Sequence, residues 1–147
     1  NAALQASACR ALRSLVPACS AAGLVDEAHV AVEMVVAAMR RHPSEPEVQE
    51  AACAVLAGVT ACCTELQSVT FTNGGLDQVV EAMRQFPDAS ELQTWGCGAL
   101  ASLAANNPMN QCAITGTKAI DLVVAAMERH ASIVQLQTMA FGGLGDG

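Results

Sequence analysis

The sequence is poor in aromatic and charged residues. Its 147 residues include three Phe, one Trp and no Tyr, and only 14% are charged, whereas 52% are hydrophobic. Alanine and valine dominate, and this composition packs helices closely and forms few aromatic-rich strands. The length suffices for one domain with a continuous core and is short for two. We therefore expect residues 1–147 to form a single domain.

Long hydrophobic runs and clusters of basic residues are also missing. No apolar run reaches the roughly 18 residues that a transmembrane helix needs, so we expect no membrane insertion. The net charge of −7 argues against nucleic-acid binding, which depends on clustered Lys and Arg. The odd number of cysteines, seven, and the lack of a signal-like segment favour reduced thiols and a cytoplasmic protein.

A repeat with a period of 44 residues runs through the chain without gaps. Its first motif begins with Leu or Val followed by Gln, and carries Cys or Phe five residues after its start. The four copies, LQASACRALRSL, VQEAACAVLAGV, LQTWGCGALASL and LQTMAFGGLGDG, begin at residues 4, 48, 92 and 136. The second motif occurs as EMVVAAM, DQVVEAM and DLVVAAM, from residues 33, 77 and 121. Each unit therefore contains at least two elements of secondary structure.

Both motifs are predicted to be helical. In the third copy of the first motif, the apolar positions follow one stripe of a 3.6-residue period: Leu92, Gly96, Cys97, Leu100 and Leu103. The strict alternation expected of a strand is absent. Gly96 lies on this stripe, where a small residue lets neighbouring helices approach closely.

Acids and prolines mark the helix ends. The second motif opens on an acid, which the helix macrodipole favours at an N-terminus, so we expect helices to start at Glu33, Asp77 and Asp121. Prolines at positions 43 and 87 end two of these helices. In the turn that follows, Asp88 is a candidate N-cap, and Ser90 with Gln93 is a candidate capping box. The less regular stretches from residues 65 and 106 contain enough apolar residues for a short third helix.

Residues 74–114, GGLDQVVEAMRQFPDASELQTWGCGALASLAANNPMNQCAI, resemble one unit of the armadillo repeat family, within the wider armadillo and HEAT-like class. They show a glycine-led helix, a proline–acid turn, a long helix and an asparagine-rich lead into the next unit. The resemblance covers nearly the whole chain as about 3.3 repeats. It implies an all-α, right-handed α-solenoid whose third helices line a concave groove that binds proteins or peptides. The first residue, Asn, and the ending GLGDG suggest a fragment of a longer solenoid.

One subgroup of this family, the nuclear-import adaptors, carries Trp and Asn ladders that hold basic peptides. The ladder positions lie six and ten residues after the first apolar residue of the motif. Here the first position holds Arg10, Ala54, Gly98 and Gly142, and the second holds Ser14, Gly58, Ser102 and Asp146. Neither ladder is present, so the resemblance does not extend to recognition of nuclear localisation signals.

No group of residues points to catalysis. Cys9, Cys53 and Cys97 share one apolar position of the repeat, and Phe141 takes that position in the last copy. A catalytic thiol would not recur in successive repeats, whereas a buried cysteine packs as a small apolar side chain. Metal-ligand spacings and phosphate-binding glycine motifs are absent. We therefore predict that the protein is not an enzyme and uses no cofactor or metal.

Trp95 is not explained by the repeat, because its equivalents are Ser7, Ala51 and Met139. Helical steps of three and four residues place Trp95, Gly98 and Ser102 on one face, which the resemblance identifies as the groove face. The predicted binding face consists of Trp95, Arg10, Ser14, Ala54, Gly58, Gly98, Ser102 and Met139. Trp and Arg are enriched at binding hot spots, which favours Trp95 as an anchor. The alternative is that Trp95 fills a gap between adjacent helices.

Two functions therefore stay open. The first is non-catalytic binding of a protein or peptide segment along the groove. The second is a structural role, in which the chain is a spacer or assembly subunit of a larger complex and has no groove of its own. Terminal repeats without polar caps favour self-association in either case.

Overall fold

The computed structural model describes residues 3, 6–11, 25–62, 64–105 and 107–145, and only the backbone of residues 25, 62, 64 and 140–145. Regular structure in these ranges is helical, which confirms the predicted all-α fold. A helical stretch at residues 6–11 precedes α2 (Val25–Arg41), α3 (Pro46–Cys62), α4 (Thr64–Thr72), α5 (Gly75–Gln85), α6 (Ser90–Ala104), α7 (Pro108–Thr115), α8 (Ala119–Arg129) and α9 (Val134–Gly145).

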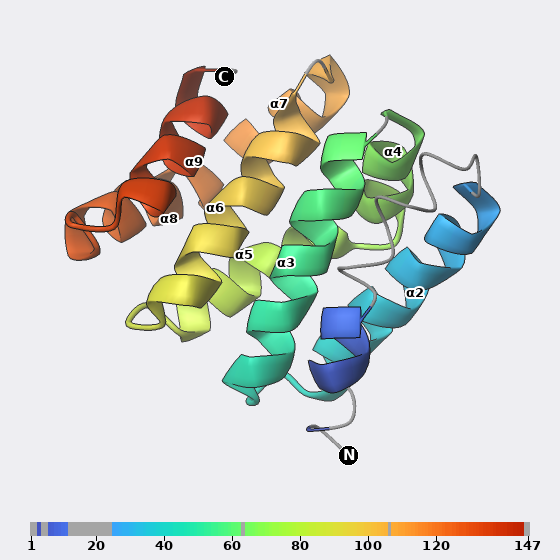
Figure 1. The fold of residues 1–147 in the computed structure, drawn as a ribbon. Coiled ribbons are helices and arrows are strands. Elements are labelled where there is room, and N and C mark those ends of the chain that lie inside the picture. Colours follow the sequence, from blue (N-terminus) through green and yellow to red (C-terminus); the bar gives the residue numbers. More distant parts are fainter. Residues whose placement is uncertain (1–2, 4–5, 12–24, 63, 106, 146–147) are drawn as a thin grey trace.

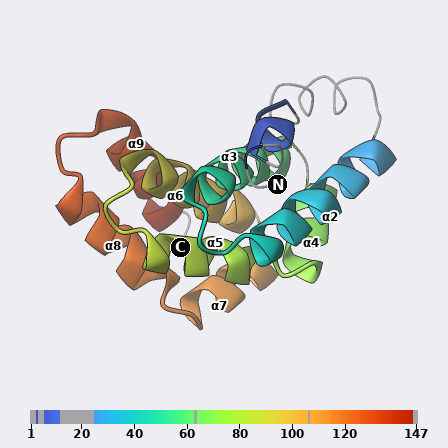
Figure 2. The same ribbon diagram turned by 90° about the horizontal axis from the view of Figure 1, so that it is seen from below.

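The longer helices form two rows. Figure 1 shows α3, α6 and α9 side by side, and Figure 2 shows α2, α5 and α8 in a second row beneath them. In the first row α6 packs between α3 and α9, so each first-motif helix meets its counterpart from a neighbouring copy. The short helix α4 contacts α2, α3 and α5, and α7 contacts α6 and α8. The short helices predicted between the two motifs are thus confirmed.

The core lies between the two rows and is built from the repeated apolar positions. Met39 and Met83 from the second row are fully buried, as is Leu56 from the first row. All five residues of the stripe predicted in α6 are buried. Because every copy contributes at the same positions, the core continues from one copy to the next instead of closing around a single centre.

Gly96 allows α5 and α6 to pack closely. A Cβ atom at this position would lie 2.7 Å from both Cγ and Sδ of Met83. The methionine side chain therefore occupies the space that any larger residue would need. This contact confirms the prediction that Gly96 permits a close approach, and packing offsets the ~1 kcal/mol by which glycine weakens a helix relative to alanine.

The repeated glutamine of the first motif joins each long helix to the helix before it. Nε2 of Gln49 donates to the carbonyl oxygens of Met39 and His42, each at 3.0 Å. Nε2 of Gln93 donates in the same way to Met83 and Phe86, each at 2.9 Å. The carbonyls of Met39 and Met83 lie four residues before a proline, which has no N–H to donate, so the buried amide satisfies them. Those of His42 and Phe86 accept in addition from the backbone N–H of Glu45 and Ala89. Gln137 repeats the arrangement with Met127 and His130, at 3.0 and 3.4 Å.

Two details of the predicted helix ends are wrong. Helix α2 begins at Val25 and has Asp26 and Glu27 in its first turn, so Glu33 lies within the helix instead of opening it. The N-cap of α6 is Ala89, which makes no side-chain cap hydrogen bond. The capping box of Ser90 and Gln93 does not form, because the Gln93 amide points back to the preceding helix. Asp77 and Asp121 do lie in first turns, as predicted.

Candidate binding face

Four of the eight residues predicted to bind a partner are half-buried on the helices of the first row: Gly58, Trp95, Ser102 and Met139. On α6 the least buried positions include Glu91, Trp95 and Ser102, which follow each other at intervals of four and seven residues. This spacing places them on one side of the helix. The indole of Trp95 is half-buried and packs against the core, so one part of its ring is held by the protein and another part faces solvent.

Helix α3, which packs beside α6, has small residues at the positions equivalent to Gly98 and Ser102. Ala54 is buried and Gly58 is half-buried. A Cβ atom on Gly58 would have no neighbour within 4 Å, so space lies open above this glycine. The surface of α3 is therefore open at Gly58.

Met139 of α9 borders the face on the other side. It is half-buried, and its sulfur lies 2.8 Å from the position that a Cβ atom on Gly98 would occupy. Gly98 is thus buried beneath the Met139 side chain and contributes space for that side chain instead of a direct contact surface. Methionine adapts to the shape of its neighbours, which suits a contact surface beside a rigid aromatic ring.

The N-terminal end of the predicted face is only partly described. Arg10 is exposed, and its Nη2 donates to Oγ of Ser7 at 3.4 Å. Ser14 lies outside the residues that the structure describes. The described face therefore joins residues of α3, α6 and α9, while Arg10 belongs to the helical stretch that precedes α2.

Two exposed acids that the sequence analysis did not assign to the face lie on it. Glu47 and Glu91 stand in the first turns of α3 and α6, and both are exposed. Glu91 precedes Trp95 by one helical turn. The signal that could have revealed them is their spacing of 44 residues, since each acid directly precedes the repeated apolar–Gln pair. They give the edge of the face next to Trp95 a negative charge.

The repeated cysteines have the character of core residues. Burial raises the pKa of Cys53 to about 12, with smaller contributions from Cys97 and Glu50. Burial alone raises the pKa of Cys97 to about 12. A thiol with such a pKa is protonated at neutral pH, so it is a poor nucleophile and metal ligand. Within the described ranges, no group of three or more His, Cys, Asp or Glu side chains is arranged to hold a metal ion.

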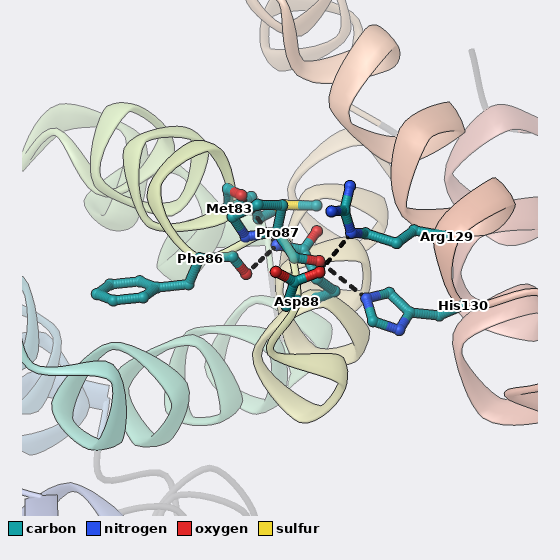
Figure 3. A network of polar contacts seen from close by, with 7 residues as sticks. Met83, Phe86, Pro87, Asp88, Arg129 and His130 are labelled. Atoms are coloured by element: carbon teal, nitrogen blue, oxygen red, sulfur yellow. Dashed lines mark hydrogen bonds and ion pairs between the residues drawn. The ribbon is translucent and has the colours of Figure 1, made fainter.

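A polar contact joins the turn after α5 to the end of α8 (Figure 3). Nε of Arg129 lies 2.6 Å from Oδ1 of Asp88, and Nε2 of His130 lies 2.9 Å from the carbonyl oxygen of Pro87. We call these four residues the clasp. Asp88 was predicted to cap α6 and instead pairs with a residue 41 positions further along the chain.

Two rows of stacked helices, with small residues and one aromatic on a shared face, define a helical-repeat protein of the α-solenoid class. A family model described as LRRK2 ARM repeat matches residues 22–141, and the chain belongs to this armadillo-repeat family. The resemblance to armadillo repeats is therefore confirmed. No curated protein and no solved structure gives a match.

Membership of the armadillo-repeat family identifies the type of module that the chain forms. An armadillo repeat region is itself non-catalytic and generally serves in protein interaction. Across the described ranges, no helix combines the length and apolar character required to cross a membrane.

Proposed function

We propose that this chain is a protein-interaction module that binds a protein or peptide segment along the solvent-facing side of α3, α6 and α9. In this proposal residues 1–147 form one domain, a right-handed solenoid with a 44-residue unit, and this side is its concave groove. The observation that carries the proposal is the half-buried position of Trp95 on α6, in a row of helices that also presents the half-buried Gly58 of α3 and Met139 of α9. An aromatic ring held on one side by the core loses little conformational entropy when a partner covers its other side.

The charge of the face favours a particular type of partner. Glu91 is exposed one helical turn before Trp95, Glu47 is exposed at the equivalent position of α3, and the chain as a whole carries a net charge of −7. A segment that combines an apolar side chain to pack on Trp95 with Lys or Arg two or three residues away matches both features. Arginine would also stack on the indole ring.

Trp95 supplies its own reporter, because it is the only tryptophan in the chain. Its fluorescence can be titrated with a panel of twelve-residue peptides that carry Leu or Phe flanked by either Arg or Glu. We expect the Arg-containing peptides to shift the emission and to protect the ring from acrylamide. By anisotropy of labelled peptides, Trp95→Ala should weaken binding about tenfold or more, and Glu91→Gln should weaken it less and in a salt-dependent manner.

Phe71→Ala is the matched control, because Phe71 is an exposed aromatic on α4 that lines a cavity with Met109 and Asn110 of α7 and is not part of the predicted binding face. Its affinity for the same peptides should equal that of the wild type. If Trp95→Ala also leaves every affinity unchanged, the groove is not the binding site and the indole only fills the gap between helices.

A structural role is the second candidate and rests on a different observation. Ile120 and Val124 of α8 are exposed at 39% and 40%, although they belong to a helix that packs in the second row. In this alternative the chain is one part of a larger stack, and its contacts lie at this end. Val124→Asp would then prevent assembly with the parent complex, while Trp95→Ala would not.

A further inference from the structure

The short helices α4 and α7 take the same place in successive copies and leave a cavity between them. Figure 1 shows both helices at the end of the molecule where α3 and α6 finish. The cavity has a volume of about 200 Å³ and is lined by Ser68, Phe71, Thr72, Asn107, Met109 and Asn110. A single water molecule needs only about 10–15 Å³ of such space, so the cavity has room for a small organic molecule. None of its lining residues belongs to the predicted binding face.

A buried polar network holds the two walls of this cavity together. Nε2 of Gln67 in α4 donates to the carbonyl oxygens of Ser102 and Ala105, at 2.7 and 3.1 Å. Nδ2 of Asn107 donates to Oε1 of Gln67 at 3.3 Å, and Oδ1 of Asn107 accepts from the backbone N–H of Asn110 at 3.2 Å. Because these bonds connect α4, the end of α6 and the start of α7, the cavity is formed before a ligand enters it, which lowers the entropic cost of binding.

Three polar atoms of the lining have no hydrogen-bond partner among the described residues. Two are the hydroxyl groups of Ser68 and Thr72, which lie one helical turn apart on the exposed side of α4. The third is Oδ1 of Asn110, a side chain that is only 4% exposed. Nδ2 of Asn110 donates to the carbonyl oxygen of Leu103 at 2.9 Å, whereas Oδ1 is not closed off from solvent. A ligand can therefore accept hydrogen bonds from two hydroxyl groups and donate one to a buried amide.

The rest of the lining is apolar and uncharged. Phe71 is 39% exposed and Met109 is 82% exposed, high values for such large apolar side chains. Among the described residues no charged side chain lines the cavity, and the acid nearest along α4, Glu65, lies 3.3 Å from His29 of α2. An ion would lose hydration in this cavity without gaining a counter-charge. The lining therefore favours an uncharged ligand that has both an apolar face and hydroxyl groups.

We propose that the cavity between α4 and α7 binds an uncharged sugar ring. A pyranose has C–H groups on the faces of its ring and hydroxyl groups around its edge. The C–H groups pack on Phe71, since the face of an aromatic ring carries partial negative charge, and Met109 adapts to the remaining apolar surface. The sugar hydroxyls accept from Ser68 and Thr72 and donate to Oδ1 of Asn110, because a hydroxyl group is both donor and acceptor.

A nucleotide is the alternative ligand with a flat ring, and the charges oppose it. Its phosphate would enter a cavity without a basic residue, on a chain with a net charge of −7. A nucleoside has no phosphate and also carries a sugar, so adenosine and uridine are included as competing probes.

The proposal can be tested by ¹H–¹⁵N NMR of the full 147-residue chain. The probes are the methyl pyranosides of glucose, galactose, mannose and N-acetylglucosamine. We expect at least one of them to give saturable shifts of the amides in α4 and at the start of α7, including the side-chain amide of Asn110, but not in α9. A ligand of this size should bind with a dissociation constant of about 1 mM. A trisaccharide that ends in the same sugar distinguishes the sources: tighter binding indicates a glycan chain, and equal or weaker binding indicates a free sugar.

Variants assign the contacts. Phe71→Ala should weaken binding about tenfold, and Thr72→Val, which removes a hydroxyl at nearly constant shape, about fivefold. Thr115→Val is the matched control, because Thr115 is an exposed threonine of α7 whose hydroxyl donates to the carbonyl oxygen of Cys112. It should bind like the wild type, as should Trp95→Ala. Circular dichroism verifies each fold, and Thr72→Val decides the test if Phe71→Ala does not fold.

Three results overturn the proposal. The first is that no pyranoside gives a saturable shift. The second is that the shifts are unchanged in Phe71→Ala and Thr72→Val. The third is that adenosine or uridine binds in the cavity while every pyranoside fails. None of these results affects the proposed groove, because peptide binding there is measured through Trp95.

Discussion

Helices α6 and α8 have similar apolar character and very different surroundings. Ten of the fifteen residues of α6 are buried, against three of the eleven in α8. Helix α6 packs between α3 and α9, whereas α8 is covered by α5, α7, α6 and α9 on one side only. The number of neighbours in the stack, more than the hydrophobicity of the helix, therefore decides how much of it is buried.

The same lesson holds for single positions of the repeat. Leu76 of α5 is 4% exposed, but Ile120, its equivalent 44 residues later in α8, is 39% exposed. The two residues have nearly the same size and occupy the same position on their helices. Helix α5 has α8 of the following copy packed against it, whereas no further second-row helix follows α8 among the described residues. An equivalent substitution should therefore have different effects in the two helices.

The largest expected difference is between a core leucine of α6 and an exposed valine of α8. Leu92 is fully buried, so Leu92→Ala should lower the free energy of unfolding by about 3 kcal/mol through lost burial and an unfilled cavity. Val124→Ala should change it by no more than about 0.5 kcal/mol. Urea denaturation followed by circular dichroism measures both. Equal losses would show that α8 is buried to the same extent as α6.

The next largest effect concerns the glutamines that join the helices. Gln93 is buried, and Gln93→Ala would leave the carbonyl oxygen of Met83 without a donor and remove one of the two donors to the carbonyl oxygen of Phe86. We expect a loss of about 2 kcal/mol in the free energy of unfolding. Gln137 is half-buried and has one longer bond, so Gln137→Ala should cost less, about 1 kcal/mol. A larger loss of stability in Gln137→Ala than in Gln93→Ala would contradict this expectation.

Alkaline pH should lower the stability of the fold by ionising the buried cysteines of the first row. The pKa values of Cys53 and Cys97 rise from 9.0 to about 12 on folding, so their stabilising contribution is complete below pH 9 and is lost as pH rises towards 12. Ionisation of each thiol should lower the free energy of unfolding by about 1 kcal/mol between pH 9 and 10. The chain has no tyrosine to obscure this effect.

Two variants test whether the buried thiols cause this loss of stability at alkaline pH. Cys97→Ala should reduce the pH dependence of the urea midpoint, because one buried thiol no longer resists ionisation. Cys112 is exposed, so Cys112→Ala should leave the dependence unchanged. Identical pH profiles for both variants would show that ionisation of the buried thiols does not govern stability above pH 9.

The smallest effect belongs to the clasp. Asp88 and Arg129 are mostly exposed, and exposed ion pairs contribute little because solvent and salt screen them. Asp88→Asn should lower the free energy of unfolding by about 0.5 kcal/mol at low salt and by less in 1 M NaCl. A loss above about 2 kcal/mol would mean that the clasp, and not the apolar contact of α5 with α8, holds these copies together.

Sequence analysis predicted the helices and the core better than the polar contacts. The stripe from Leu92 to Leu103 and the role of Gly96 followed from helical periodicity, because an apolar stripe must face another helix. The capping box of Ser90 and Gln93 was wrong although the recurrence of Gln was evident. Its amide reaches carbonyls seven and ten residues earlier, and only the turn between α5 and α6 brings these groups together.

In the candidate site, too, some features could be predicted from the sequence and others could not. Helical spacing placed Trp95 and Ser102 on one side of α6, which agrees with their partial exposure. Spacing could not reveal that Met139 covers Gly98, because that contact depends on how far α9 lies from α6. The acids Glu47 and Glu91 were also missed, since only the stack shows that the first turns of α3 and α6 border the same face.

The sequence by itself determined the helices, the positions that each helix turns towards the core and the succession of equivalent units, because these depend on local periodicity and on repetition along the chain. Tertiary structure decided which equivalent positions are covered, which carbonyl each glutamine binds and which acid pairs with Arg129. These outcomes depend on distances between packed helices, whose contacting residues lie seven and ten positions apart for Gln93 and 41 positions apart for Arg129 and Asp88. Such distances follow from the packing of whole helices, which no short stretch of sequence encodes.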